Sequence, residues 1–311
     1  MPPTAPLFIV LNRGSGKHGE GDVRLSIEAA LTEAGREFSI HEAEEPSQLD
    51  SFAAEVVTKA RACGGVVVAA GGDGTINAVA TAALGSGCPF GVLPLGTFNY
   101  FSRVHGIPSD LPGACQVLLG AQAFEVQVGL VNDRVFLVNG SLGAYPELLE
   151  EREIAKHRLG RSRLVAIAAG LRSLLRSHRH VRLDIEAQRG SRSVIAETLF
   201  VSNNRLQLKR VGIADSELVE HDRLIAVLVR PAGVLGTLGL ILRALLGRLG
   251  EAEQVTSFDF ERMTVRPRLR KRRVKVAKDG EVETLAAPLT FRVASSALCL
   301  LRPAVVGEDP G

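Results

Sequence analysis

Residues 66–80, VVVAAGGDGTINAVA, constrain the fold of this chain more than any other stretch. Residues 66–70 are apolar throughout, which is typical of a strand buried on both faces, and residues 75–84 are predicted to form a helix. A buried strand that leads into a helix belongs in a parallel sheet covered by helices. The glycine turn, which we define as Gly71-Gly72-Asp73-Gly74-Thr75, is therefore expected at the carboxyl edge of such a sheet.

The rest of the first 124 residues repeats this pattern. Residues 7–11 and 90–95 are further apolar runs, and residues 20–35 and 47–63 carry apolar side chains at helical spacing. We therefore predict an N-terminal parallel-sheet α/β nucleotide-binding domain over residues 1–124.

The pattern changes near residue 125. Short apolar runs separated by turn-forming residues such as Asn132-Asp133 predict an antiparallel, β-sandwich-like domain over residues 125–295, interrupted by a helical stretch at 146–177. The tail 304–311 is expected to be disordered.

Composition narrows the class of protein. A chain of 311 residues suits two domains, and with 5% aromatic residues and no Trp it is poorly equipped to stack on nucleic-acid bases. The four cysteines are far apart, which argues against structural zinc and a disulfide framework. The N-terminus does not read as a signal peptide, so we expect a cytoplasmic protein that does not bind nucleic acid.

The glycine turn predicts a phosphate site. A helix that starts after a parallel strand presents free backbone N–H groups and the positive end of its dipole, and glycines let the backbone approach a ligand closely. Asp73 would repel a bare phosphate, so it is expected to hold Mg²⁺ or to accept a proton from an attacking hydroxyl. Phosphate, metal and base together indicate phosphoryl transfer.

Two better-known phosphate motifs are absent. The GxGxxG spacing of dinucleotide-binding enzymes does not occur at the glycine turn. A P-loop reading through Gly16-Lys17 fails because Leu11 and His18 stand where a glycine and a Ser or Thr are required.

Four motifs in order resemble the diacylglycerol kinase catalytic-domain family of lipid kinases, particularly its bacterial members. They are Asn12-Arg13-Gly14-Ser15-Gly16, the glycine turn with Ile76-Asn77, FGVLPLGTFNYFSR at 90–103, and Asp279-Gly280-Glu281. The segments FLVNGSLGAYP and FVSNN also look like family segments. Gly-Gly-Asp-Gly alone is shared with NAD kinases and phosphofructokinases, whereas Leu-Pro-Leu-Gly-Thr-Phe-Asn favours lipid kinases.

The resemblance implies an active site in the cleft between the two domains, with a strand at about 296–303 completing the first. It further implies transfer of the ATP γ-phosphate, with Mg²⁺, to a hydroxyl of a membrane lipid such as diacylglycerol, within phospholipid biosynthesis. Glu281 would be the general base, and Asp279 and Asp73 would complete an acidic, magnesium-linked network. The implied nucleotide contacts are Asn12, Gly71, Gly72, Asp73, Gly74, Thr75, Asn77 and Thr97.

The family also carries a second, structural Mg²⁺ bound by two backbone carbonyls and one aspartate. Val219, Asp222 and Leu224 fit that spacing, although a single aspartate in a polar loop is equally an ordinary turn residue.

Two further segments bear on how the protein would reach a lipid substrate. Residues 266–278, RPRLRKRRVKVAK, contain no acidic residue and lead into Asp279, which suits either an anionic membrane surface or a solvated strand. Residues 233–250 are apolar but interrupted by Arg243, Arg248 and glycines, so they suit an interfacial helix, the wall of an acyl-chain pocket or a core helix. We expect a peripherally membrane-associated protein, and exposed sheet edges are compatible with a homodimer.

Three alternatives to a lipid kinase stay open. An NAD-kinase-like enzyme would share the glycine turn, but the Leu-Pro-Leu-Gly-Thr segment argues against it. A non-catalytic lipid-binding protein would be expected to lack either the glycine turn or the terminal acid, and both are present. A nucleic-acid-binding module would rest on the basic run alone.

Overall fold

The computed structural model of the chain describes residues 5–12, 20–43, 46–120, 122–150, 180–188, 190–214, 218–219, 222–268 and 272–304. Positions 13–16 of the first motif, most of the helical stretch predicted at 146–177, and the tail from residue 305 onward lie outside these ranges. The chain divides into two compact units, Met1–Gln127 with Ser295–Gly311, and Val128–Ala294. The boundaries predicted from the sequence are 124/125 and 295/296.

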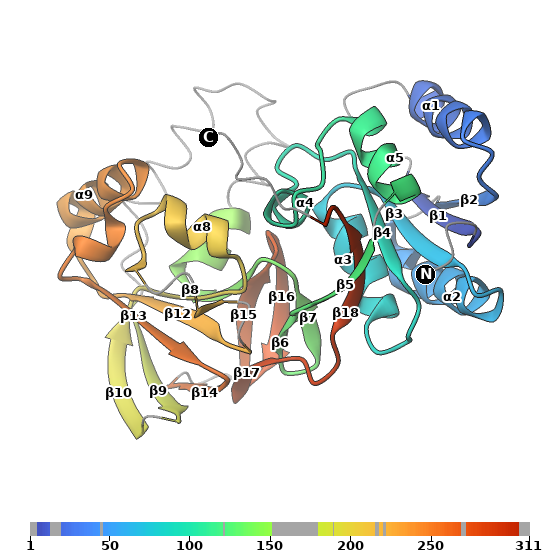
Figure 1. Cartoon of the computed structure of the whole chain (residues 1–311). Coiled ribbons are helices and arrows are strands. Elements are labelled where there is room, and N and C mark those ends of the chain that lie inside the picture. Colours follow the sequence, from blue (N-terminus) through green and yellow to red (C-terminus); the bar gives the residue numbers. More distant parts are fainter. Residues whose placement is uncertain are drawn as a thin grey trace. The chain divides into compact units, whose positions relative to one another are not determined.

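The first unit is built on one six-stranded sheet in the order β2-β1-β3-β4-β18-β5 (Figure 1). Four neighbouring strands run parallel, β18 is parallel to β4, and β5 closes the edge antiparallel to β18. The strands are β1 (Leu7–Asn12), β2 (Phe38–Ala43), β3 (Val66–Gly71), β4 (Phe90–Pro94), β5 (Gln122–Val126) and β18 (Leu298–Arg302). Every residue of β3 and β4 is buried, so the prediction of a parallel sheet covered on both faces is confirmed.

Helices connect these strands, as the spacing of apolar residues predicts. They are α1 (Glu20–Glu33), α2 (Leu49–Ala62), α3 (Asp73–Ala83), α4 (Tyr100–Val104) and α5 (Leu111–Gly120), with a 3-10 turn at Pro46–Gln48. The register pairs Gly71 with Pro94, so β3 and β4 end side by side. The glycine turn and the loop after β4 consequently start from the same edge of the sheet.

The second unit contains two antiparallel sheets, ordered β10-β9-β14-β17-β6-β7 and β13-β12-β11-β8-β15-β16. The first is formed by β6 (Gly129–Val131), β7 (Arg134–Phe136), β9 (Val181–Ala187), β10 (Gly190–Ala196), β14 (Arg262–Pro267) and β17 (Leu289–Val293). The second is formed by β8 (Asn139–Gly143), β11 (Thr198–Ser202), β12 (Leu224–Val229), β13 (Val255–Phe260), β15 (Arg273–Lys278) and β16 (Glu281–Ala286). One cluster of buried residues draws on both sheets, which confirms the antiparallel β-sandwich-like class.

Two helices, α8 (Arg205–Arg210) and α9 (Gly233–Leu245), cover the other face of the second sheet (Figure 1). Alternation along β12 separates the two faces, because Leu224, Ala226 and Leu228 enter the cluster between the sheets while Ile225 and Val227 pack with α8 and α9. No helix within the described ranges is both long enough and apolar enough to cross a membrane.

Candidate active site

The glycine turn connects β3 to α3, and the side chain of Thr75 fixes its geometry. Thr75 is 2% exposed, and its Oγ1 accepts a hydrogen bond from Asn12 Nδ2 at 3.1 Å, which ties the end of β1 to the first turn of α3. A Cβ on Gly71 would lie 2.5 Å from Thr75 Oγ1, so no larger residue fits there without displacing this contact. Ile76 N then donates to Gly72 O at 3.0 Å and begins the helix.

The loop after β4 packs directly against the glycine turn. Leu95 N donates to Gly71 O at 2.9 Å, and a Cβ on Gly96 would lie 2.9 Å from Gly72 Cα. Asn99 holds the loop closed, because its Nδ2 donates to Gly96 O at 3.0 Å and its φ is +48°. Asn99 has no predicted role, although asparagine is among the few residues that tolerate a positive φ.

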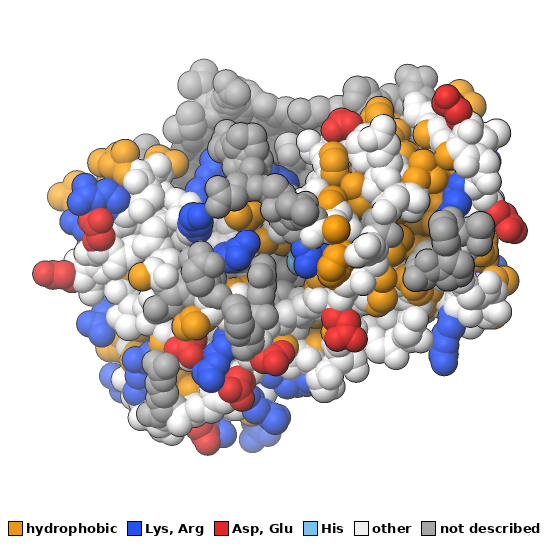
Figure 2. Space-filling view, viewed as in Figure 1, with side chains coloured by type: hydrophobic (Ala, Val, Ile, Leu, Met, Phe, Trp, Pro, Cys, Tyr) orange, Lys and Arg blue, Asp and Glu red, His pale blue; other side chains and the backbone are white. Residues whose placement is uncertain are grey.

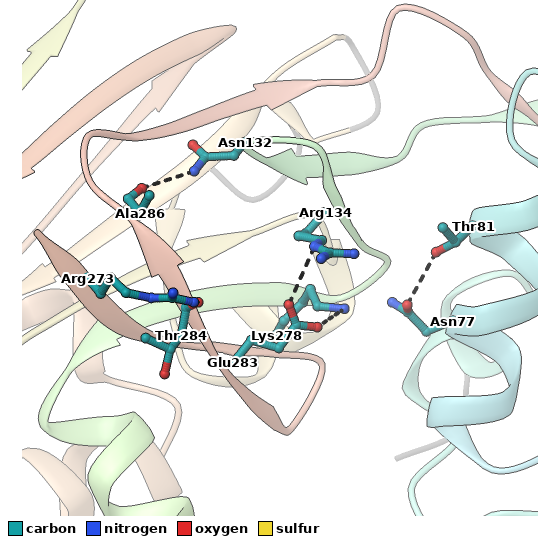
Figure 3. Close-up of polar contacts among 9 residues, drawn as sticks. All are labelled: Asn77, Thr81, Asn132, Arg134, Arg273, Lys278, Glu283, Thr284 and Ala286. Carbon is teal, nitrogen blue, oxygen red and sulfur yellow. Dashed lines mark hydrogen bonds and ion pairs between the residues drawn. The ribbon is translucent and has the colours of Figure 1, made fainter. Parts of the chain in front are cut away.

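The other predicted nucleotide contacts lie on the same two loops. Asp73 and Gly74 are the first residues of α3 and are partly exposed. Asn77 follows one turn later and accepts a hydrogen bond from Thr81 Oγ1 at 3.4 Å (Figure 3). Thr97 is exposed in the loop after β4. The first unit thus brings together every implied nucleotide contact at one edge of its sheet, where helix N–H groups face outward.

The acidic motif near the end of the chain forms a hairpin turn in the second unit. Asp279 and Gly280 are the two residues between β15 and β16, with φ values of +48° and +92°. Positive φ at both central positions defines a type I′ turn, which matches the twist of the flanking strands. Glu281 is the first residue of β16 and is exposed.

The Asp279 carboxylate is bound by backbone donors. Three consecutive N–H groups, those of residues 137–139, donate to its oxygens at 2.7, 2.9 and 3.0 Å. Asp279 N in turn donates to Asn139 O at 2.9 Å. Charge-assisted bonds of this kind are the strong ones, so Asp279 positions the hairpin that carries Glu281.

Asn203 holds the opposite side of the same segment. Its Nδ2 donates to Leu137 O at 3.1 Å and its N–H donates to Val138 O at 2.8 Å. Asn139 Nδ2 also donates to Gln207 Oε1 at 3.1 Å, on α8. The segments FLVNGSLGAYP and FVSNN therefore form one hydrogen-bonded support beneath the hairpin, a role that neither segment shows by itself.

A second carboxylate on β16, that of Glu283, lies two residues beyond Glu281. Glu283 accepts from Lys278 Nζ at 2.9 Å and lies 3.8 Å from Arg134 Nε (Figure 3). Glu281 and Glu283 are two residues apart on one strand, so they share a face of the sheet. Glu283 is thus a counter-ion for two cations and offers a matched control for Glu281.

The proposed structural metal site is only partly described. Val219 forms an isolated bridge with Arg223, Asp222 has a φ of +57°, and Leu224 begins β12. One carboxylate and two carbonyls are oxygen ligands of the kind Mg²⁺ prefers. Among the described residues, no group of three or more His, Cys, Asp or Glu side chains is placed to hold a metal ion.

The described part of the basic run at 266–278 lies on β14, on β15 and at the residues that flank them. Four of its cations pair with acidic side chains: Arg266, Arg268, Lys275 and Lys278. Arg266 and Arg268 each lie 2.8 Å from an acidic side chain of β9, Glu186 and Asp184 respectively. The hydrogen bond from Arg268 is the main reason that the pKa of Asp184 is lowered. On β15, Lys275 pairs with Glu150. This pairing favours the solvated-strand interpretation of the run.

The comparisons with known proteins agree with the motifs. The sequence model of the diacylglycerol kinase catalytic domain matches residues 6–131, which include β1, the glycine turn and the loop after β4. The resemblance seen in the motifs is thereby confirmed for this part of the chain.

Curated relatives match over similar stretches. A protein named "Probable lipid kinase YegS-like" from Pseudomonas aeruginosa is 42% identical over 122 residues, which are 38% of this chain and 38% of that protein. A protein of the same name from Cronobacter sakazakii is 31% identical over 149 residues, 47% of this chain and 48% of that protein. The matched stretch thus spans less than half the length of either relative.

A solved structure shares the fold over nearly the whole chain. The crystal structure of a diacylglycerol kinase from Bacillus anthracis superposes with a TM-score of 0.71 at 17% identity, covering 97% of this chain and 98% of that one. At that identity the likeness concerns the fold.

Proposed function

We propose that this chain, whose residues 6–131 belong to the diacylglycerol kinase catalytic-domain family, is a lipid kinase that uses ATP and Mg²⁺. It would transfer the γ-phosphate of ATP to a hydroxyl group of a membrane lipid such as diacylglycerol. The observation that carries the proposal is the glycine turn, where Thr75 and Asn12 hold the start of α3 and the loop after β4 packs against Gly72.

The nucleotide part of the proposal follows from backbone geometry. The first N–H groups of a helix have no partner within the helix, and they carry the positive end of its dipole. Glycine at positions 71, 72 and 74 leaves no side chain between these donors and a triphosphate. We assign nucleotide contacts to this turn and to Asn12, Asn77 and Thr97.

Magnesium fits the chemistry of the same turn. The Asp73 carboxylate at the start of α3 would hold the ion together with phosphate oxygens, both of which are hard oxygen ligands. When bound, the ion neutralises charge on the triphosphate.

We assign the proton transfer to Glu281. The lipid hydroxyl oxygen forms a bond to the γ-phosphorus, the bond from that phosphorus to the β,γ-bridging oxygen breaks, and ADP leaves with the electron pair. The hydroxyl proton passes to the Glu281 carboxylate. An alcohol loses its proton only as the new bond forms, so the base must be held in position, which the Asp279 contacts provide.

The acceptor places this reaction at a membrane surface. Diacylglycerol and similar lipids reside in bilayers, so we propose that the protein works in the cytoplasm as a peripheral protein on an anionic membrane. Net positive charge, +3 for the whole chain, is in keeping with that surface.

The experiment is transfer of label from γ-labelled ATP into detergent-dispersed diacylglycerol, a sphingoid base and, separately, NAD. Wild type is compared with Glu281→Gln and with Glu283→Gln on the same strand. We expect label in a lipid, a loss of about a hundredfold to ten-thousandfold for Glu281→Gln, and less than about a threefold change for Glu283→Gln.

Two results would overturn the proposal. Label in NAD but in no lipid would make the acceptor a nucleotide. Equal losses in the two glutamate variants would remove Glu281 from the role of base.

A further inference from the structure

Helix α9 and its C-cap residue carry most of the exposed large hydrophobic side chains of the described part of the chain. Among the described residues, ten large hydrophobic side chains are exposed, and six of them belong to α9 and its C-cap residue. Leu235 is 85% and Leu245 is 80% exposed. We define the α9 stripe as Leu235, Leu238, Ile241, Leu242, Leu245 and Leu246.

The α9 stripe is one continuous face of the helix. At about 100° per residue, its six members fall within an arc of about 140°. Leu240 points the other way, is buried, and packs with Leu208 of α8 and with Ile225 and Val227 of β12. The helix is therefore anchored to the sheet by one side while the opposite side stays open, which excludes the core-helix interpretation of residues 233–250.

Positive charge borders the stripe at its C-terminal end. No acidic residue occurs between positions 231 and 250, where Arg243 and Arg248 lie. Glu251 follows directly and pairs with Arg248 at 2.8 Å, so Arg243 carries the positive charge of this segment. The end of α8 adds Lys209 and Arg210, because Leu249 N donates to Val211 O at 2.9 Å and brings α8 beside the end of α9. Figure 2 shows hydrophobic and basic side chains, with an acidic one beside them, where Figure 1 places α9.

We propose that α9 lies in the plane of an anionic bilayer, with the α9 stripe in the boundary between head groups and acyl chains and the bordering cations on lipid phosphates. This inference rests on the proposed function, which requires work at a membrane. With 13 residues, α9 is about 20 Å long, too short to span a bilayer but suited to lie along its surface. The absence of acids from the helix fits an anionic lipid surface, which would repel carboxylates.

The experiment uses the absence of tryptophan from the chain. Leu242→Trp places a single reporter in the α9 stripe, and Leu25→Trp places one on α1 at a similar exposure, 64% against 59%. Each is mixed, without nucleotide, with vesicles of equal parts phosphatidylglycerol and phosphatidylcholine, with or without brominated acyl chains. We expect a blue shift and quenching by bromine for Leu242→Trp and neither for Leu25→Trp.

Vesicle flotation gives a second, independent readout. A double variant of the α9 stripe, Leu238→Gln and Leu242→Gln together, should weaken partition of the protein onto the vesicles at least about tenfold. Leu25→Gln should change it less than about twofold.

The outcomes separate this inference from the proposed function. The inference is overturned if the Leu242→Trp fluorescence is not quenched on saturating brominated vesicles. It is also overturned if, without vesicles, the Leu242→Trp fluorescence shifts to the blue as the protein concentration rises, because a second copy of the chain would then cover the α9 stripe. A protein that labels no acceptor but inserts α9 keeps this inference and overturns the function. Label in detergent-dispersed lipid without insertion of α9 supports the proposed function and overturns this inference.

Discussion

Asp279 and Asn139 are joined by two hydrogen bonds, one to the Asp279 carboxylate and one between backbone groups. Asn139 N donates to Asp279 Oδ1 at 3.0 Å, while Asp279 N donates to Asn139 O at 2.9 Å. The carboxylate also accepts from the N–H groups of Leu137 and Val138. One aspartate thus fixes both the turn before Glu281 and a segment 140 residues earlier in the chain.

Asp279→Ala should therefore destabilise the protein. It leaves the N–H groups of buried Leu137 and Val138 without their acceptor, and the loss of charge-assisted bonds in such a place is expected to cost about 3 kcal/mol. Urea unfolding at pH 7 measures the change. Glu283→Ala is the control, with an expected loss below about 1 kcal/mol because its ion pairs are partly exposed.

A different result would change the role that we assign to Asp279. If Asp279→Ala unfolds at the wild-type urea midpoint but no longer transfers phosphate, the residue acts in the chemistry and not in positioning the hairpin.

A second prediction concerns the glycine turn. Gly71→Ala would place a methyl group 2.5 Å from Thr75 Oγ1, and Thr75 is buried and cannot move away. We expect a loss of about 1–3 kcal/mol from overpacking and at least tenfold weaker ATP binding by calorimetry. Gly120→Ala, at the end of α5, meets nothing within 4 Å and should leave both quantities unchanged. Equal ATP affinity in the two variants would contradict the assignment of the turn.

The sequence predicts the first unit well because its central strands, β3 and β4, are buried on both faces. Such strands are apolar at every position, so residues 66–70 and 90–95 stand out without any knowledge of their neighbours. The glycine turn is equally readable, because its residues, its spacing and its role all lie within one local segment.

The second unit is harder to predict for two physical reasons. The strands β13 and β16 are the two edges of their sheet, and β16 is partly or fully exposed along its length, so neither reads as an apolar run. The central strand β8 does not read as an apolar run either, because it is made largely of small residues. A Cβ on Gly140 would lie 3.2 Å from the Phe291 ring, so a larger side chain would crowd the core.

The support beneath the hairpin is invisible in the sequence for a further reason. It joins Asp279 to residues 137–139 and these to Asn203, over separations of 66 to 142 positions. No spacing rule connects residues so far apart. The motifs predict which residues matter, and the structure gives Asp279 a support role in addition to the acidic one that the resemblance implies.

A third prediction tests which surface of the protein contacts the membrane. It uses two pairs of substitutions that change the net charge equally. Lys209→Gln with Arg243→Gln removes two cations beside the α9 stripe, whereas Arg266→Gln with Arg268→Gln removes two that pair with acidic side chains of β9. The two sets lie on opposite sides of the sheet that carries α9. At low salt we expect the first pair to weaken flotation with anionic vesicles at least about fivefold and the second less than about twofold. Equal effects would show that net charge alone governs binding.

The last prediction concerns His105, which follows α4 and packs edge-on against Phe101 with ring centroids 4.6 Å apart. Burial, with a smaller contribution from the cationic Arg302, lowers the pKa of His105 to about 3. Since the unfolded imidazole has a pKa near 6.5, the unfolded state binds more protons between about pH 3 and 6.5. The free energy of unfolding should therefore rise with pH across this window, by at most about 1.4 kcal/mol per pH unit from this group.

Urea unfolding between pH 4 and 7 measures that slope for wild type, His105→Phe and His180→Asn. His105→Phe cannot take up the proton, so its stability should depend less steeply on pH, whatever its stability at pH 7. His180 is exposed and directly precedes β9, and His180→Asn is the control for removing a different histidine. If His105→Phe keeps the wild-type slope, the imidazole must protonate in the folded protein as readily as in the unfolded chain, and burial would not hold it neutral.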